Sequence, residues 1–122
     1  MKAEKINNVA ILVKDLEQAN KLFADLFGIE FNGPYENKQT DIKRLMSPIG
    51  IALVTPLTTD GATARTLEKR GEGLHLLSLK VPKVEEASTE MKSRGIRQIG
   101  GDGKRLAVFH PRDLCGVMIE LI

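Results

Sequence analysis

Histidine and cysteine, two residue types that often do acid–base and metal chemistry near neutral pH, are few in this sequence and widely spaced. The 122 residues contain two histidines, His75 and His110, and one cysteine. His75 lies in GEGLHLLSL, a strand-like segment, and is followed by Leu76 rather than by a second metal-ligand type. Glu120 lies in the apolar segment GVMIELI. Burial among apolar groups raises a carboxyl pKa and suits it to accept a proton from carbon, so Glu120 is the first candidate for a general base.

Each candidate also has a structural alternative. Glu120 can instead be ion-paired with a cation such as Lys43 or Lys80. Lys43 can stabilise an enolate or bind a carboxylate, or it can be an exposed lysine that protects a sheet edge. His110, in FHPRD, can exchange a proton with a ligand or contact an acyl group, or it can be a turn histidine before Pro111. All of these alternatives remain open at the level of sequence.

A glycine-rich segment, GGDGKR at residues 100–105, has the composition of a phosphate-binding loop. It lacks the strand-to-helix context of a nucleotide fingerprint, which favours a hairpin turn. Lys104, Arg105 and Arg112 nevertheless provide a basic rim that suits the phosphates of coenzyme A.

Composition narrows the class of protein. The length fits one domain with its own core, and no apolar run approaches the ~18 residues of a membrane helix. The N-terminal residues do not have the pattern of a signal peptide, so we expect a cytoplasmic protein. Cys115 cannot form an internal disulfide and is expected to be a buried small hydrophobe. Net charge is only +2 and aromatic residues make up 4%, which gives little support for nucleic-acid or membrane binding.

The element pattern occurs twice. Alternating apolar residues precede a helical period in which Leu16, Ala19, Leu22, Phe23 and Leu26 share a face, with Asp15 and Gly28 as helix start and stop signals. Three strand candidates follow, in 29–35, 41–47 and 50–56, which makes βαβββ. The second half repeats this order with a strand in 74–81, a helix after Lys83, and strands in 96–100, 105–111 and 116–122. A connector of about 57–73 holds a short helix candidate at 62–70.

The repeat has a constant offset. At a shift of 68 residues Val13 matches Val81, Glu17 matches Glu85, Ala19 matches Ala87, Ile51 matches Ile119 and Leu53 matches Leu121. We therefore predict an α+β fold in which module one, about 5–56, and module two, about 74–122, close into a curved mixed-sheet half-barrel with a central cleft and outer helices. Strand alternation then places Asn8, Ala52, Leu76 and Glu120 on the cleft floor, and turns His75 to the other face.

Several segments resemble the vicinal oxygen chelate superfamily, which includes glyoxalase I, bleomycin-resistance proteins and extradiol dioxygenases. They are VAILVKDLEQANKLFADLFGIE, LTTDGATARTLEKRGEGLH and VFHPRDLCGVMIEL, and they are most similar to methylmalonyl-CoA epimerase. In that family the metal ligands match Asn8, Ala52, Leu76 and Glu120 by position. Only Glu120 is a good ligand for a divalent ion, because Ala and Leu have no lone pair and an Asn amide replaces imidazole poorly. We therefore expect no metal site of the family type.

The resemblance implies a metal-independent isomerase or lyase that transfers a proton on a small carbonyl compound or an acyl-CoA. Glu120 would be the base, His110 an acid, and Lys43 or Arg112 the contacts to an anionic group. Lys43 lies in the region where some epimerases carry a catalytic carboxylate, which puts two-base epimerisation in doubt. The alternatives are a non-catalytic ligand-binding protein of the bleomycin-resistance type and a metal enzyme with rearranged ligands. A small-molecule ligand and a homodimer are expected in each case.

Overall fold

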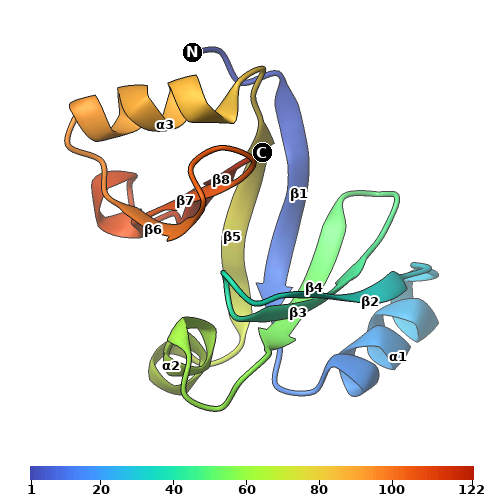
Figure 1. Ribbon diagram of the computed structural model, residues 1–122. Helices are drawn as coiled ribbons and strands as arrows, with labels where there is room; N and C mark the ends of the chain where they lie inside the picture. The colour runs from blue at the N-terminus through green and yellow to red at the C-terminus, as the bar shows by residue number, and fades with distance from the viewer. The chain divides into compact units, whose positions relative to one another are not determined.

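The structure, a computed structural model, describes all 122 residues (Figure 1). Its elements follow the predicted order, βαβββ, a connecting helix, and βαβββ. The first set is β1 (Lys5–Leu12), α1 (Leu16–Phe27), β2 (Asn32–Asn37), β3 (Ile42–Met46) and β4 (Ile51–Pro56), followed by α2 (Ala62–Arg70). The second set is β5 (Gly73–Lys80), α3 (Val84–Ser93), β6 (Gln98–Gly101), β7 (Ala107–Phe109), the 3₁₀ turn η1 (Pro111–Asp113) and β8 (Ile119–Leu121).

The eight strands form a mixed sheet in the order β2-β3-β4-β1-β5-β8-β7-β6. β5 and β8 are parallel, whereas β2–β3, β3–β4, β6–β7 and β7–β8 are antiparallel. The fold class is therefore α+β, as predicted. Contacts divide the chain into two compact units, and the division runs through β1 and β5. Unit 1 comprises Met1–Val9 with Leu76–Ile122, and unit 2 comprises Ala10–His75.

In unit 2, α1 covers one face of β3 and β4. The Asp15 carboxylate accepts a hydrogen bond from the Gln18 N–H at 3.0 Å, and Gly28 ends the helix in the left-handed conformation, as the start and stop signals predicted. A core cluster of Val13, Leu45 and Leu53 packs against Leu16, Ala19 and Phe23 from the helix. Leu22 and Leu26, which were predicted on the same helix face, are instead exposed, because they lie at the edge of the 3.6-residue stripe.

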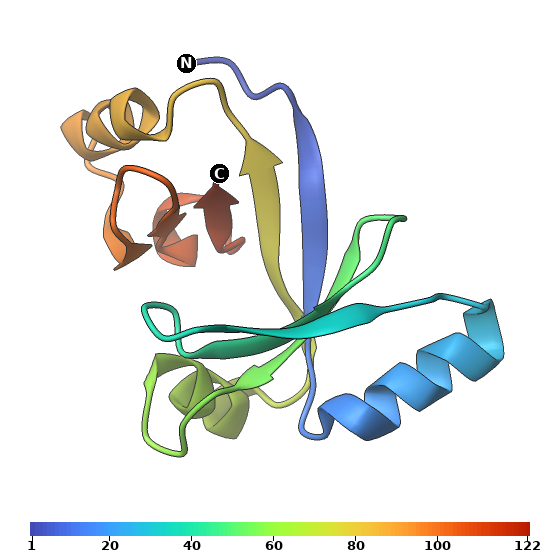
Figure 2. The same ribbon diagram turned by 45° about the vertical axis from the view of Figure 1, so that its right-hand side comes forward.

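The second hairpin of unit 2, β3–β4, is tied to α2 by Asp41. Figure 2 shows this hairpin beside β2, with α2 following β4. The Asp41 carboxylate accepts hydrogen bonds from the Thr58 N–H at 2.8 Å, the Thr58 hydroxyl at 2.7 Å and the Ala64 N–H at 3.4 Å. Burial raises the pKa of Asp41, but these hydrogen bonds outweigh it and hold the pKa below its ordinary value. A side chain at Gly61 would collide with this carboxylate.

In unit 1, α3 lies against β5, β7 and β8 through a core of Val81, Val84, Ala87, Ala107, Phe109 and Leu121. GGDGKR forms the β6–β7 hairpin turn, as predicted, with the Asp102 carboxylate accepting from the N–H groups of Lys104, Arg105 and Leu106. The prediction for Cys115 was wrong. This side chain is exposed, because Cys115 belongs to a turn and has a left-handed backbone conformation (φ 59°).

Candidate functional site

The most buried carboxylate of unit 1 is Glu120 on β8, with 6% of its surface exposed. The Ser78 hydroxyl donates a hydrogen bond of 2.7 Å to Glu120 Oε1. Ser78 is fully buried and is paired with Glu120 in the parallel register of β5 and β8. The Asn7 side-chain amide donates to the Ser78 hydroxyl oxygen at 3.4 Å. Asn7, Ser78 and Glu120 thus form a hydrogen-bonded chain that fixes the position of the carboxylate.

Strand alternation explains why Glu120 faces away from α3. Its neighbours Ile119 and Leu121 pack into the helix-covered core, so the Glu120 side chain turns to the other face of the sheet. Val108 lies opposite Glu120 in the β7–β8 register and shares that face. Asn8 and Leu76, also predicted site residues, belong to unit 1 and are both buried. Ser78 was not among the predicted site residues, although its position two residues after Leu76 puts it on the same strand face.

His110 follows β7 and caps η1. Its Nδ1 accepts a hydrogen bond of 3.0 Å from the Arg112 N–H, so the proton of the neutral imidazole is on Nε2. His110 lies two residues after Val108 and continues the alternation that places Val108 on the Glu120 face. His110 therefore has the structural role in a turn that the sequence allowed. Its Nε2–H is the group that can still donate a hydrogen bond to a ligand.

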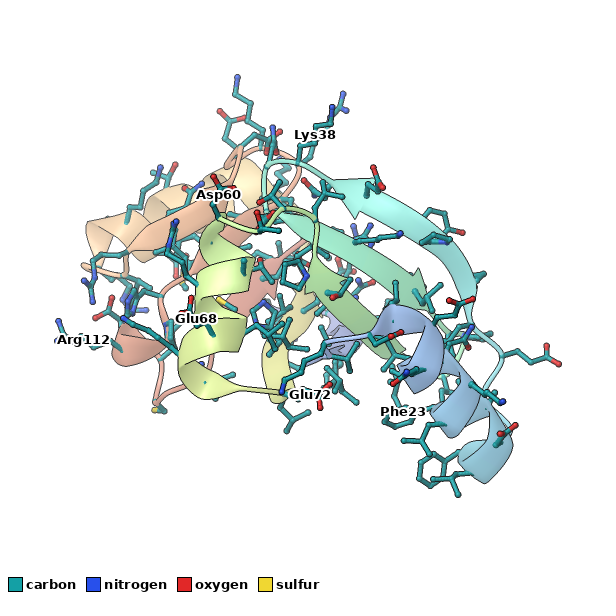
Figure 3. The ribbon with its side chains drawn as sticks, turned by 90° about the horizontal axis from the view of Figure 1, so that it is seen from below. Phe23, Lys38, Asp60, Glu68, Glu72 and Arg112 are labelled. Carbon is teal, nitrogen blue, oxygen red and sulfur yellow. The ribbon has the colours of Figure 1, made fainter.

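The three residues of the predicted basic rim, Lys104, Arg105 and Arg112, do not lie together in the structure. Lys104 and Arg105 line a groove of about 880 Å³ in unit 1 together with Lys80 and Lys83. Glu85 and Glu86 of α3 also line this groove, and Lys83 lies 3.6 Å from Glu86. Arg112 is not part of the groove. It is exposed, and its side chain points away from the strands (Figure 3).

In unit 2 the cation on the Ala52 face is Arg44 rather than Lys43. Strands β3 and β4 pair Arg44 with Val54 and Met46 with Ala52, whereas Lys43 pairs with Thr55. Lys43 shares the parity of Leu45, which packs under α1. Lys43 was predicted as an anion contact, and the register places it on the face opposite that of Ala52.

His75 is buried, with 7% of its surface exposed, and its Nδ1 has no hydrogen-bond partner. It lines a pocket of about 180 Å³ with Leu12, Thr66, Arg70 and Glu72. Burial, and secondarily the charge of Arg70, lower the pKa of His75 to about 4. His75 is therefore neutral at physiological pH and packs within unit 2.

Two of the four positions that the resemblance matches to metal ligands, Ala52 and Leu76, have aliphatic side chains without lone pairs, which leaves Asn8 and Glu120 as the side chains there that could ligate a metal ion. No three His, Cys, Asp or Glu side chains gather where they could hold a metal ion. No helix is long and apolar enough to cross a membrane.

Comparison with known proteins identifies the family. The profile of the Glyoxalase/Bleomycin resistance protein/Dioxygenase superfamily matches residues 7–115. The chain belongs to this superfamily. Its fold is also that of methylmalonyl-CoA epimerase from Mycobacterium tuberculosis, whose crystal structure matches with a TM-score of 0.83 and 27% identity over 98% of this chain and 87% of that one.

Two curated relatives are similar over nearly the whole of this superfamily member. Mitochondrial methylmalonyl-CoA epimerase from Bos taurus is 29% identical over 96% of this chain and 73% of the bovine protein. Ethylmalonyl-CoA/methylmalonyl-CoA epimerase from Cereibacter sphaeroides is 29% identical over 96% of each chain. The predicted relationship to epimerases is therefore confirmed.

Proposed function

We propose that the protein is an epimerase-like enzyme that moves a proton next to the carbonyl group of an acyl-CoA, without a metal ion. The observation that carries the proposal is the buried Glu120 carboxylate, held by the Ser78 hydroxyl on the strand face opposite α3. Similarity to epimerases of acyl-CoA substrates supports the substrate class.

In the proposed reaction Glu120 removes the proton on the carbon beside the thioester. As the C–H bond breaks, its electron pair moves toward the carbonyl oxygen and forms an enolate, and return of a proton to carbon completes an isomerisation. The Ser78 hydrogen bond prevents the carboxylate from rotating away, which favours a reactive arrangement. Nε2–H of His110 is the proposed donor toward the enolate oxygen or carbon, because Nδ1 is held by the Arg112 N–H.

The basic groove of unit 1 is the proposed contact for the phosphates of coenzyme A. Lys80 follows Ser78 by two residues on β5, so the groove begins beside the end of the strand that carries the Glu120 partner. Lys104 and Arg105 add two cations from the β6–β7 turn. Charge-assisted hydrogen bonds to phosphate are the strongest that these side chains form.

The test is exchange of the α-proton of methylmalonyl-CoA in deuterated water, followed by mass spectrometry. The protein is treated with a chelator in one arm and supplied with cobalt in the other. The proposal predicts exchange that survives the chelator, disappears in Glu120→Gln and persists in Glu4→Gln, an exposed glutamate of the same unit that lies outside the groove. Circular dichroism confirms that both variants fold.

Two outcomes would contradict the proposal. Exchange that occurs only with cobalt would overturn metal independence. The absence of exchange in both arms would overturn the epimerase-like activity and favour a protein that only binds its ligand.

A further inference from the structure

Arg44 is a charged side chain on an apolar strand face. It lies on β3 of unit 2, paired with Tyr35 on one side and Val54 on the other. The residues that share its face on β3 and β4 are apolar, namely Ile42, Met46, Ala52 and Val54, and three of them are more than nine-tenths buried. Arg44 itself is half-buried. The face therefore holds one cation among aliphatic groups.

One nitrogen of the Arg44 guanidinium group lacks a hydrogen-bond partner. Its Nε is buried and makes no hydrogen bond, and the side chain takes part in none of the ion pairs of the chain. The acidic residue nearest in register, Glu36, lies opposite Lys43 on the other face. Leaving a buried donor of a charged group unpaired destabilises the folded protein. An unsatisfied buried donor in a native protein requires an explanation, and a ligand that completes the hydrogen bonds provides one.

We propose that Arg44 recognises the carboxylate of a small aliphatic acid or acyl group. The planar guanidinium matches a carboxylate with two parallel hydrogen bonds, and the arginine charge does not depend on pH in the physiological range. The aliphatic side chains around it suit a short hydrocarbon chain attached to that carboxylate. A phosphate group, which requires several donors, is a poorer match for a single cation.

Carboxylate binding by Arg44 involves only residues of unit 2 and does not require catalysis. Combined with the proposed function it specifies an acyl-CoA whose acyl group carries a second, free carboxylate, and that extension rests on the proposed function. Lys43 offers a matched control, because it has the same charge on the same strand but lies on the opposite face.

The test measures binding of methylmalonate, propionate and inorganic phosphate by isothermal titration calorimetry and by the Arg44 Nε–H signal in NMR spectra. The wild type is compared with Arg44→Gln, Arg44→Lys and Lys43→Gln. We expect Arg44→Gln to weaken methylmalonate binding by about ten- to a hundredfold, and Arg44→Lys to retain part of it. Lys43→Gln should change the affinity by less than about twofold.

A second measurement needs no ligand. Because Arg44 is kept at the expense of stability, Arg44→Met should raise the melting temperature of the free protein by about 3 °C or more and abolish the further rise caused by methylmalonate. Equal methylmalonate affinity in Arg44→Gln, or a lower melting temperature in Arg44→Met, would overturn the inference. Phosphate binding as tight as that of methylmalonate would overturn the choice of a carboxylate. Glu120→Gln should retain Arg44-dependent binding, which separates this inference from the proposed reaction.

Discussion

Protonation of His75 should make the protein lose stability in mild acid. In the unfolded chain a histidine has a pKa of 6.5, whereas burial and the nearby charge of Arg70 lower the pKa of His75 to about 4 in the folded protein. Between these two values the unfolded chain binds more protons than the folded one, so the free energy of unfolding falls as the pH falls. The contribution of neutral His75 is fully present above pH 6.5 and is lost progressively toward pH 4.

The magnitude follows from the two pKa values. At about 1.4 kcal/mol per pH unit, the loss between pH 8 and pH 4 is about 3 kcal/mol, and it is already about 2 kcal/mol at pH 5. His75 is almost completely buried, so solvent screens little of this effect. A loss of this size is a large part of the stability of a small domain.

The assay is urea unfolding between pH 4 and pH 8 for the wild type and His75→Gln. The two proteins contain the same carboxylates, so the difference between their curves isolates the His75 imidazole. His75→Gln should be less stable than the wild type at pH 8 and should approach it by about 2 kcal/mol at pH 5. Parallel curves for wild type and His75→Gln would refute a buried, neutral His75.

Three further predictions concern the hydrogen bonds of Asp41, the bond between Ser78 and Glu120, and the basic groove of unit 1. Asp41→Ala removes the acceptor of three hydrogen bonds and should lower the free energy of unfolding by about 2–3 kcal/mol at pH 7, as measured by urea titration. Because the pKa of Asp41 is lowered in the folded protein, this loss of stability should become smaller as the pH falls below 3.8, the ordinary pKa of an aspartate. Ser78→Ala should reduce the rate of proton exchange about tenfold with little change in KM, and Ser78→Thr should restore part of the rate. If the hydrogen bond from Ser78 to Glu120 were purely structural, Ser78→Ala would change the stability and not the rate. Replacing Lys104 and Arg105 by Gln should raise KM for the CoA thioester more than for the pantetheine thioester, which lacks the 3′-phosphate and the diphosphate. An equal rise in KM for the two thioesters would exclude phosphate contacts in the groove.

The order of elements was predictable because each signal is local. The Asp15 cap and Gly28 fix both ends of α1, and Gly71 follows α2 at the predicted residue. The parity of β8 was predictable as well, since Ile119 and Leu121 leave only one face for Glu120. Ser78 was harder to recognise as a site residue. Its role depends on the register of two parallel strands 42 residues apart in sequence, and nothing local specifies that register.

The placement of Lys43 and Arg44 shows where local sequence stops deciding a site. The β3 segment IKRLM has apolar residues at both parities, Ile42 and Met46 on one face and Leu45 on the other. Alternation alone therefore assigns α1 to either face, and each choice brings a different cation beside Ala52. The decision comes from packing: Leu45 faces Leu53 across β3–β4, and both contact the α1 cluster, which turns Arg44 to the other side. A cation on either face of such a strand lies among apolar groups, and Arg44 is the one with a buried nitrogen, Nε, that makes no hydrogen bond within the protein.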